Sequence, residues 1–191
     1  IANYPNNPTG AVTSLAQLAT LVDFCRRHDL LLLHDLAYSE LTYDGYVAPS
    51  VFEVPDAADV AVEFHSCSKS FNMAGMRAGF AVGRADALDA LLAYRANIGY
   101  GVSTPVQHAA AFALENVRTL MPPIVAEYRA RRNALYQAFE EHGWSVSAPQ
   151  AAMYAWLPLP DGIEPWDAVH RTLMDAQVMI TPGLAFGVAG E

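Results

Sequence analysis

The segment EFHSCSKSFNMAGMRAGFAVG, residues 63–83, places one lysine and one arginine eight positions apart, at Lys69 and Arg77. A lysine amine is a poor nucleophile at neutral pH unless nearby positive charge or desolvation lowers its pKa, and both are expected here. The planar guanidinium of Arg77 suits bidentate binding of phosphate, and Ser66 can add a hydroxyl donor. Taken singly, Lys69 could be a surface residue and Arg77 the partner of an acidic side chain.

Three further polar residues follow apolar or turn segments. Asp35 comes just after the leucine run 30–33, and a carboxylate at the end of a buried strand needs a strong partner or a cation. Tyr38 can point its hydroxyl into the same crevice, and Asn7 lies in the turn PNNPTG. Each has a structural alternative: Asp35 could cap a helix, Tyr38 could fill a core, and Asn7 could serve only the turn.

The apolar runs that precede these residues predict an α/β fold. Short strands are expected at residues 1–4, 30–33, 60–64 and 78–83, with a helix at 14–28 behind a Thr or Ser cap. Strands that alternate with helices imply a mostly parallel sheet with right-handed crossovers. Ligands bind beyond the carboxyl ends of such strands, and NNPTG, HDLAY and SCSKS each follow a strand. We therefore expect the three clusters to meet at one edge of the sheet.

The later part of the chain has helical periodicity and then alternates again. A domain boundary is expected near the sequence MPP at residues 121–123. This boundary would separate a unit at 1–120 from a unit at 121–191. The expected elements are helices at 86–97, 105–116, 123–142 and 166–176, and strands at 151–159 and 178–183.

Composition narrows the function classes. The 191 residues are 53% hydrophobic and carry a formal charge of −9, which disfavours binding to nucleic acid. Two cysteines, Cys25 and Cys67, outside any CxxC pair indicate a reducing cytoplasm rather than a disulfide framework. The six histidines lack metal-site spacing, and no membrane span or signal peptide is expected.

The combination of polar groups at the predicted sheet edge suits one cofactor. Pyridoxal 5'-phosphate needs a lysine to form an imine and a carboxylate to keep its pyridine nitrogen protonated. It also needs a phenol and an amide to bind its ring oxygen, and a hydroxyl and a guanidinium for its phosphate. All six groups are expected at this edge.

Three ordered motifs also resemble a known family. NPTG, the DxAY of residues 35–38 and the SxSKxFxMxGxRxG of residues 66–79 are similar to the class I/II, fold type I, pyridoxal phosphate-dependent aminotransferases. The resemblance spans essentially the whole chain, including TPGxxFG near residue 187. Within the family, the phrases around these motifs look most like LL-diaminopimelate aminotransferases and their close relatives. The fold implied is a fold type I, mostly parallel sheet with flanking helices, followed by the beginning of a smaller α/β domain.

The resemblance implies a role for each candidate residue. Lys69 would form an imine with the cofactor and, once released by substrate, move a proton between substrate carbon and cofactor. The other implied contacts are Asp35 with the pyridine nitrogen, Tyr38 and Asn7 with the ring hydroxyl, and Ser66 and Arg77 with the phosphate. The reaction implied is a ping-pong transfer in which an amino acid leaves its amine on the cofactor and a 2-oxo acid such as 2-oxoglutarate collects it.

Family members are longer than this chain, which begins at Ile1 and ends within TPGLAFGVAGE. We therefore expect a piece of a larger protein, in which residues 1–120 are the later part of the large cofactor domain and residues 121–191 a partial small domain. A homodimer is expected at full length. A carbon-sulfur β-lyase, the ligand-sensing domain of a transcription regulator and an inactive fragment remain alternatives.

Overall fold

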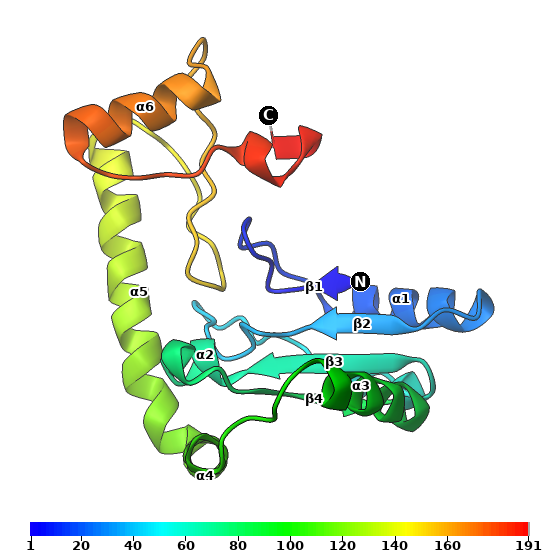
Figure 1. The fold of residues 1–191 in the computed structure, drawn as a ribbon. Helices are drawn as coiled ribbons and strands as arrows, with labels where there is room; N and C mark the ends of the chain where they lie inside the picture. Colours follow the sequence, from blue (N-terminus) through cyan, green and yellow to red (C-terminus); the bar gives the residue numbers. More distant parts are fainter. Residues whose placement is uncertain (191) are drawn as a thin grey trace. The chain divides into compact units, whose positions relative to one another are not determined.

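The computed structural model describes residues 1–190 and contains a sheet in the strand order β1-β2-β3-β4 (Figure 1). The strands are β1 (Ala2–Asn3), β2 (Leu32–Asp35), β3 (Ala61–Ser66) and β4 (Gly79–Gly83). The first three run parallel, as expected, and β4 runs antiparallel to β3. The only α-helix between β3 and β4 is α2 (Cys67–Ser70). This connection is too short for the crossover that a parallel return requires.

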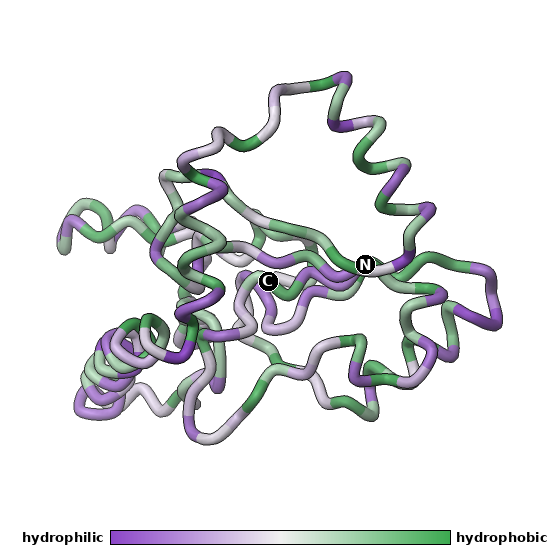
Figure 2. Tube along the Cα trace, turned by 90° about the horizontal axis from the view of Figure 1, so that it is seen from below, coloured by the Kyte–Doolittle hydropathy of each residue, from purple (hydrophilic) through white to green (hydrophobic). Residues whose placement is uncertain are grey.

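The predicted helices are all present. They are α1 (Leu15–Arg27), α3 (Ala85–Ile98), α4 (Thr104–Glu115), α5 (Val117–Glu141) and α6 (Pro165–Ala176). The start of α1 follows from a capping box, in which Ser14 and Gln17 satisfy each other's backbone N–H groups. Figure 2 shows that hydrophobic and hydrophilic residues are interspersed along the helical segments.

Helix α5 begins earlier than predicted and contains both Pro122 and Pro123. Proline removes a helical hydrogen bond, so the sequence favoured a start near residue 123. Tertiary packing outweighs this local cost, because Met121 is buried and Ile124 and Val125 pack beside it in one hydrophobic cluster.

The two strands predicted in the later part of the chain are wrong. In residues 151–159 only Ala151 takes part in an isolated bridge, with Thr42, and residues 178–183 form no strand. Gly183–Phe186 instead forms a 3-10 helix. A strand must pair its backbone groups with a neighbouring strand, and neither segment has such a neighbour within the described residues.

Two hydrophobic clusters support the sheet. The first fills the space between α1 and the strands, and its buried members include Leu18, Val22 and Leu32. The second joins the segment after β2 to the first half of α5, and it contains Tyr38, Leu41, Met121 and Ala152. The second cluster therefore fixes the residues that follow the carboxyl end of β2.

The chain divides into two compact units, Ile1–Ala155 and Trp156–Glu191. The first contains the sheet and helices α1 to α5, and the second contains α6. Helix α5 crosses the boundary predicted near residue 120 without interruption. That boundary refers to domains of a longer protein and stays a prediction.

Candidate active site

The strand register brings the predicted clusters to one edge of the sheet. Asn3 pairs with Asp35, and Asp35 pairs with Phe64, so β1, β2 and β3 end side by side. Ser66, the last residue of β3, pairs with Gly79, the first residue of β4. Because β4 runs the opposite way, its beginning lies at this edge. Arg77, two residues before β4, is thereby placed at the same edge as the carboxyl ends of the parallel strands.

Lys69 is the only lysine in the 191 residues and lies in the four-residue helix α2. Ser66 caps this helix, because its hydroxyl accepts a hydrogen bond from the Ser68 N–H at 3.3 Å. The Lys69 side chain is half-buried, and its Nζ lies 5.8 Å from the centre of the Tyr38 ring. No carboxylate within the described residues forms an ion pair with it. The amine is thus held against the face of a phenol rather than neutralised by an acid.

Tyr38 is buried, and its hydroxyl oxygen lies 2.5 Å from that of Tyr154. Burial raises the pKa of the Tyr38 phenol above its ordinary value, and the Tyr154 hydroxyl and the charge of Asp35 add to that increase. The Asn7 side chain acts in the opposite direction on the same pKa. Asp35, Asn7 and Tyr154 therefore all lie close enough to influence the Tyr38 hydroxyl, which stays protonated at neutral pH.

Asp35 is the last residue of β2 and is half-buried. Its Oδ1 accepts a hydrogen bond from the backbone N–H of Ala37 at 3.3 Å. The described residues supply no donor to its second oxygen. This carboxylate can therefore accept a further donor, as a protonated ring nitrogen would require.

The remaining candidates lie at the same edge but are more exposed. Arg77 has φ 54° and ψ 49°, the left-handed region that residues other than glycine seldom occupy. Its guanidinium donates to the Ala74 carbonyl oxygen at 2.9 Å and is otherwise exposed. Asn7 is exposed, and its backbone N–H donates to Asn3 Oδ1 at 2.9 Å. Among the described residues, Ser66 and Arg77 form no hydrogen bond with each other.

These residues fit pyridoxal 5'-phosphate. A lone lysine amine, a carboxylate with a free acceptor position and a buried phenol with a neighbouring amide lie at one sheet edge. A hydroxyl and a guanidinium lie at the same edge. Together they match the imine, ring nitrogen, ring oxygen and phosphate of this cofactor. Within residues 1–190 there is no group of three or more His, Cys, Asp or Glu side chains suited to a metal ion.

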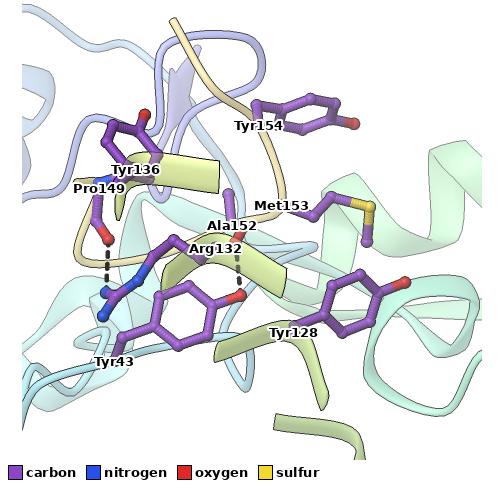
Figure 3. A pocket seen from close by; sticks show the side chains of 8 residues that line it. All are labelled: Tyr43, Tyr128, Arg132, Tyr136, Pro149, Ala152, Met153 and Tyr154. Atoms are coloured by element: carbon purple, nitrogen blue, oxygen red, sulfur yellow. Dashed lines mark hydrogen bonds between the residues drawn. The ribbon is translucent and has the colours of Figure 1, made fainter. Parts of the chain in front are cut away.

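The sequence did not reveal Tyr154. It belongs to the segment that was predicted as a strand, and 116 positions separate it from Tyr38. Figure 3 shows it in a pocket lined by aromatic side chains beside Arg132. Arg132 pairs with both carboxylate oxygens of Asp44 at 2.7 and 3.1 Å and lies 4.6 Å from the centre of the Tyr43 ring. The only local signal is the sequence AAMY at residues 151–154. This short pattern does not by itself indicate that Tyr154 contacts Tyr38.

The comparisons with known proteins decide the family. The sequence profile of the aminotransferase class I and II family matches residues 1–191. The chain belongs to this family. Its members use pyridoxal 5'-phosphate, so the predicted cofactor is confirmed at the level of the family.

Individual relatives agree with this assignment. The chain is 42% identical to LL-diaminopimelate aminotransferase 2 of Trichormus variabilis, over 99% of this chain and 48% of that protein. It is 41% identical to the glutamate-pyruvate aminotransferase AlaC of Escherichia coli, over 100% of this chain and 47% of that protein. The chain thus spans about half the length of the curated relatives it matches.

Solved structures confirm the fold class. Substrate-bound BacF from Bacillus subtilis superposes with a TM-score of 0.93 and 35% identity, over 98% of this chain and 48% of that one. An aromatic aminotransferase from Pyrococcus horikoshii superposes with a TM-score of 0.92 and 29% identity, over 99% of this chain and 51% of that one. The prediction of a fold type I transferase with a mostly parallel sheet and flanking helices is confirmed. Among the described residues, no helix has the length and apolar character that crossing a membrane demands.

Proposed function

We propose that the full-length protein is a pyridoxal phosphate-dependent aminotransferase that moves an amino group between an amino acid and a 2-oxo acid. The observation that carries the proposal is the position of Lys69. The only lysine of this chain lies in α2, directly after β3, over the Tyr38 ring and at the same sheet edge as Asp35. Membership of the aminotransferase family supports the same conclusion.

Bound pyridoxal phosphate would supply an aldehyde that takes up amines and a ring that accepts electrons. Lys69 Nζ would hold the cofactor and then carry a proton to and from the substrate carbon. The Asp35 carboxylate would keep a proton on the ring nitrogen, and the Tyr38 hydroxyl and the Asn7 amide would donate to the ring oxygen. Ser66 and Arg77 would bind the phosphate, where a guanidinium forms bidentate hydrogen bonds.

The proposed amino donors are LL-diaminopimelate, alanine and aspartate, with 2-oxoglutarate as an acceptor. Identities of 40–43% to aminotransferases named for diaminopimelate support the first, and would place the protein in lysine biosynthesis. The 41% identity to AlaC supports alanine. A panel of these donors with the full-length protein ranks them by kcat/KM.

We also propose how the complete protein is organised. Residues 1–120 would belong to its large cofactor-binding domain and residues 121–191 to its small domain, and the protein would be a cytoplasmic homodimer. The two buried free cysteines, Cys25 and Cys67, support a reducing compartment. Mass measurement in solution tests the dimer.

The decisive experiment is covalent labelling of Lys69. The full-length protein is incubated with pyridoxal phosphate, reduced with borohydride and digested, and the modified peptide is identified by mass spectrometry. We expect one cofactor per chain on the peptide containing Lys69, and no label at that peptide in Lys69→Ala. A label elsewhere in the protein, or none, would reject the proposal.

The same protein separates transfer from the lyase alternative. An aminotransferase consumes a 2-oxo acid acceptor in proportion to the amino acid converted. Release of pyruvate and ammonia from cystathionine without any acceptor would instead assign the labelled lysine to a carbon-sulfur β-lyase.

A further inference from the structure

We propose that Tyr154 is a positioning residue that orients the Tyr38 hydroxyl toward the ring oxygen of the cofactor. The inference rests on the proposed function, because it assigns a second tyrosine to the same site. Tyr154 follows α5 in the sequence, whereas the other candidate residues lie at the strand ends and in the segments next to them.

The two tyrosines form a specific pair rather than a loose contact. Their hydroxyl oxygens are 2.5 Å apart, and their rings meet edge to face with centres 5.5 Å apart and an angle of 76°. Tyr38 is 3% exposed. If the Tyr154 hydroxyl were removed, water could not readily take its place beside Tyr38. A hydrogen bond this short between the buried Tyr38 and the half-buried Tyr154 restricts where each hydroxyl can point.

The backbone before Tyr154 is anchored to the segment after Tyr38. The Ala152 N–H donates to the Leu41 carbonyl oxygen at 2.8 Å, and the Tyr43 N–H donates to the Gln150 carbonyl oxygen at 2.8 Å. The Tyr43 hydroxyl also donates to the Ala152 carbonyl oxygen at 2.7 Å, which Figure 3 marks with a dashed line. These three hydrogen bonds attach residues 150–152, directly before Tyr154, to the segment that follows Tyr38.

Ala152 shows that this attachment constrains the backbone. It has φ 66°, in the left-handed region that is unfavourable for a residue with a Cβ. It is also 1% exposed and belongs to the cluster that contains Tyr38, Leu41 and Met121. The surrounding packing thus imposes the turn that directs residue 154 toward the site.

The proposed role of Tyr154 depends on which of the two tyrosine hydroxyls donates its proton. A phenol donates one proton and can accept another, so two hydroxyls in contact share a single hydrogen bond. Either hydroxyl can be the donor in this pair, and a Tyr38 proton directed to Tyr154 agrees with the raised pKa of Tyr38 in the absence of a ligand. When an anionic oxygen on the ligand accepts a hydrogen bond from the Tyr38 hydroxyl, Tyr154 is left to donate to the Tyr38 oxygen. A hydroxyl that accepts while it donates is also the stronger donor. Tyr154 therefore supports the donor function of Tyr38 through their shared hydrogen bond.

Removing only the Tyr154 hydroxyl should weaken the stabilisation of negative charge on the ring oxygen. The bound cofactor should then keep its proton to higher pH. The net free energy of one hydrogen bond predicts that the spectroscopic pKa of the bound cofactor rises by about half a unit or more in Tyr154→Phe.

The experiment is a spectrophotometric pH titration of the full-length protein with bound pyridoxal phosphate. Tyr154→Phe is compared with Tyr136→Phe, which loses a hydroxyl from the same pocket but has no hydrogen bond to Tyr38. We expect a rise for Tyr154→Phe and none for Tyr136→Phe. In the Tyr38→Phe background, the further change Tyr154→Phe should have no effect, because the two residues act through one hydrogen bond.

Three results would overturn the inference. The first is an unchanged cofactor pKa in Tyr154→Phe, and the second is an equal shift in Tyr136→Phe. The third is a shift of the same size whether or not Tyr38 keeps its hydroxyl, because Tyr154 would then act independently. If the unmodified protein takes up no cofactor on Lys69, the proposed function itself fails, which the labelling experiment reports separately.

Discussion

Glu63 is a buried charge that the proposed chemistry does not use. It is 2% exposed on β3 and accepts hydrogen bonds from His34 Nδ1 at 3.1 Å and His65 Nε2 at 2.8 Å. The Ser50 hydroxyl and the Val51 N–H also donate to it. Burial alone would raise the pKa of this carboxyl, but the hydrogen bonds outweigh burial and lower the pKa to about 2. The cluster ties β2, β3 and the start of the 3-10 helix Val51–Glu53 together.

The lowered pKa of Glu63 predicts acid sensitivity. A carboxyl with a folded-state pKa of about 2 and an ordinary value of 4.5 adds stability above pH 4.5, and this stability is lost as the pH falls toward 2. The pKa difference corresponds to about 3 kcal/mol in the free energy of unfolding. In Glu63→Gln we expect that much lower stability at neutral pH and a flatter dependence between pH 4.5 and 2, measured by urea unfolding of the full-length protein.

Glu127→Gln is the matched control for this measurement. Its carboxylate makes an exposed ion pair with Arg131 at 2.8 Å, so the loss should be within about 1 kcal/mol. Equal stability and equal acid dependence in the two variants would contradict the assignment of the acid sensitivity to Glu63.

Asp35 supports a second prediction at the residue scale. Asp35→Asn removes the negative charge that would hold a proton on the ring nitrogen, so kcat should fall by about 100-fold or more. Covalent attachment through Lys69 should persist, because the lysine itself is unchanged. Transferase assays combined with borohydride labelling separate the two effects. Asp86→Asn, an exposed residue paired with Arg84, should retain activity, and a kcat for Asp35→Asn near that of this control would contradict the role.

At the scale of elements, the pairing of β3 with β4 decides where Arg77 lies. A Cβ on Gly79 would lie 2.6 Å from the His65 carbonyl oxygen, and a Cβ on Gly83 would lie 2.3 Å from the Ala61 carbonyl oxygen. Real Cβ atoms do not approach backbone oxygens so closely. Glycine at both ends of β4 therefore permits this strand to lie against β3 in its observed register.

Gly79→Ala should displace the start of β4 and with it Arg77. We expect weaker cofactor binding, together with a loss of about 1–3 kcal/mol of stability. Gly75→Ala, where an added Cβ meets nothing within 4 Å, should change neither. Equilibrium titration with pyridoxal phosphate and thermal unfolding measure the two effects. Unchanged affinity in Gly79→Ala would show that the position of Arg77 does not depend on this pairing.

The sequence was most informative where local signals and function coincide. The apolar runs before Asp35 and Lys69 predicted parallel strands and a common edge, and helical periodicity predicted every long helix. Local patterns carry no information on contacts between distant segments. For that reason the antiparallel direction of β4, the irregular segment at 151–159 and the Tyr38–Tyr154 pair emerged only from the structure.

At the scale of the whole molecule, the surface of helices α3 and α4 is unusually apolar. No residue of α3 is buried, and Leu92 and Tyr94 are 68% and 63% exposed. Phe112 on α4 is 62% exposed. Soluble proteins seldom leave many large apolar side chains in water, because covering them is favourable by about 25 cal/mol for each Å². These helices are therefore expected to be covered in the complete protein.

This surface predicts different behaviour for the 191-residue chain and for the full-length protein. Expressed alone, the chain should bind a hydrophobic dye strongly and elute in size-exclusion chromatography as a concentration-dependent mixture of associated species. The full-length protein should bind little dye and give one species. Replacing Leu92 and Phe112 with serine should reduce both effects in the isolated chain, whereas replacing Val47, which is 79% exposed outside these helices, should change them little. A monomeric isolated chain with low dye binding would show that the apolar faces of α3 and α4 need no cover.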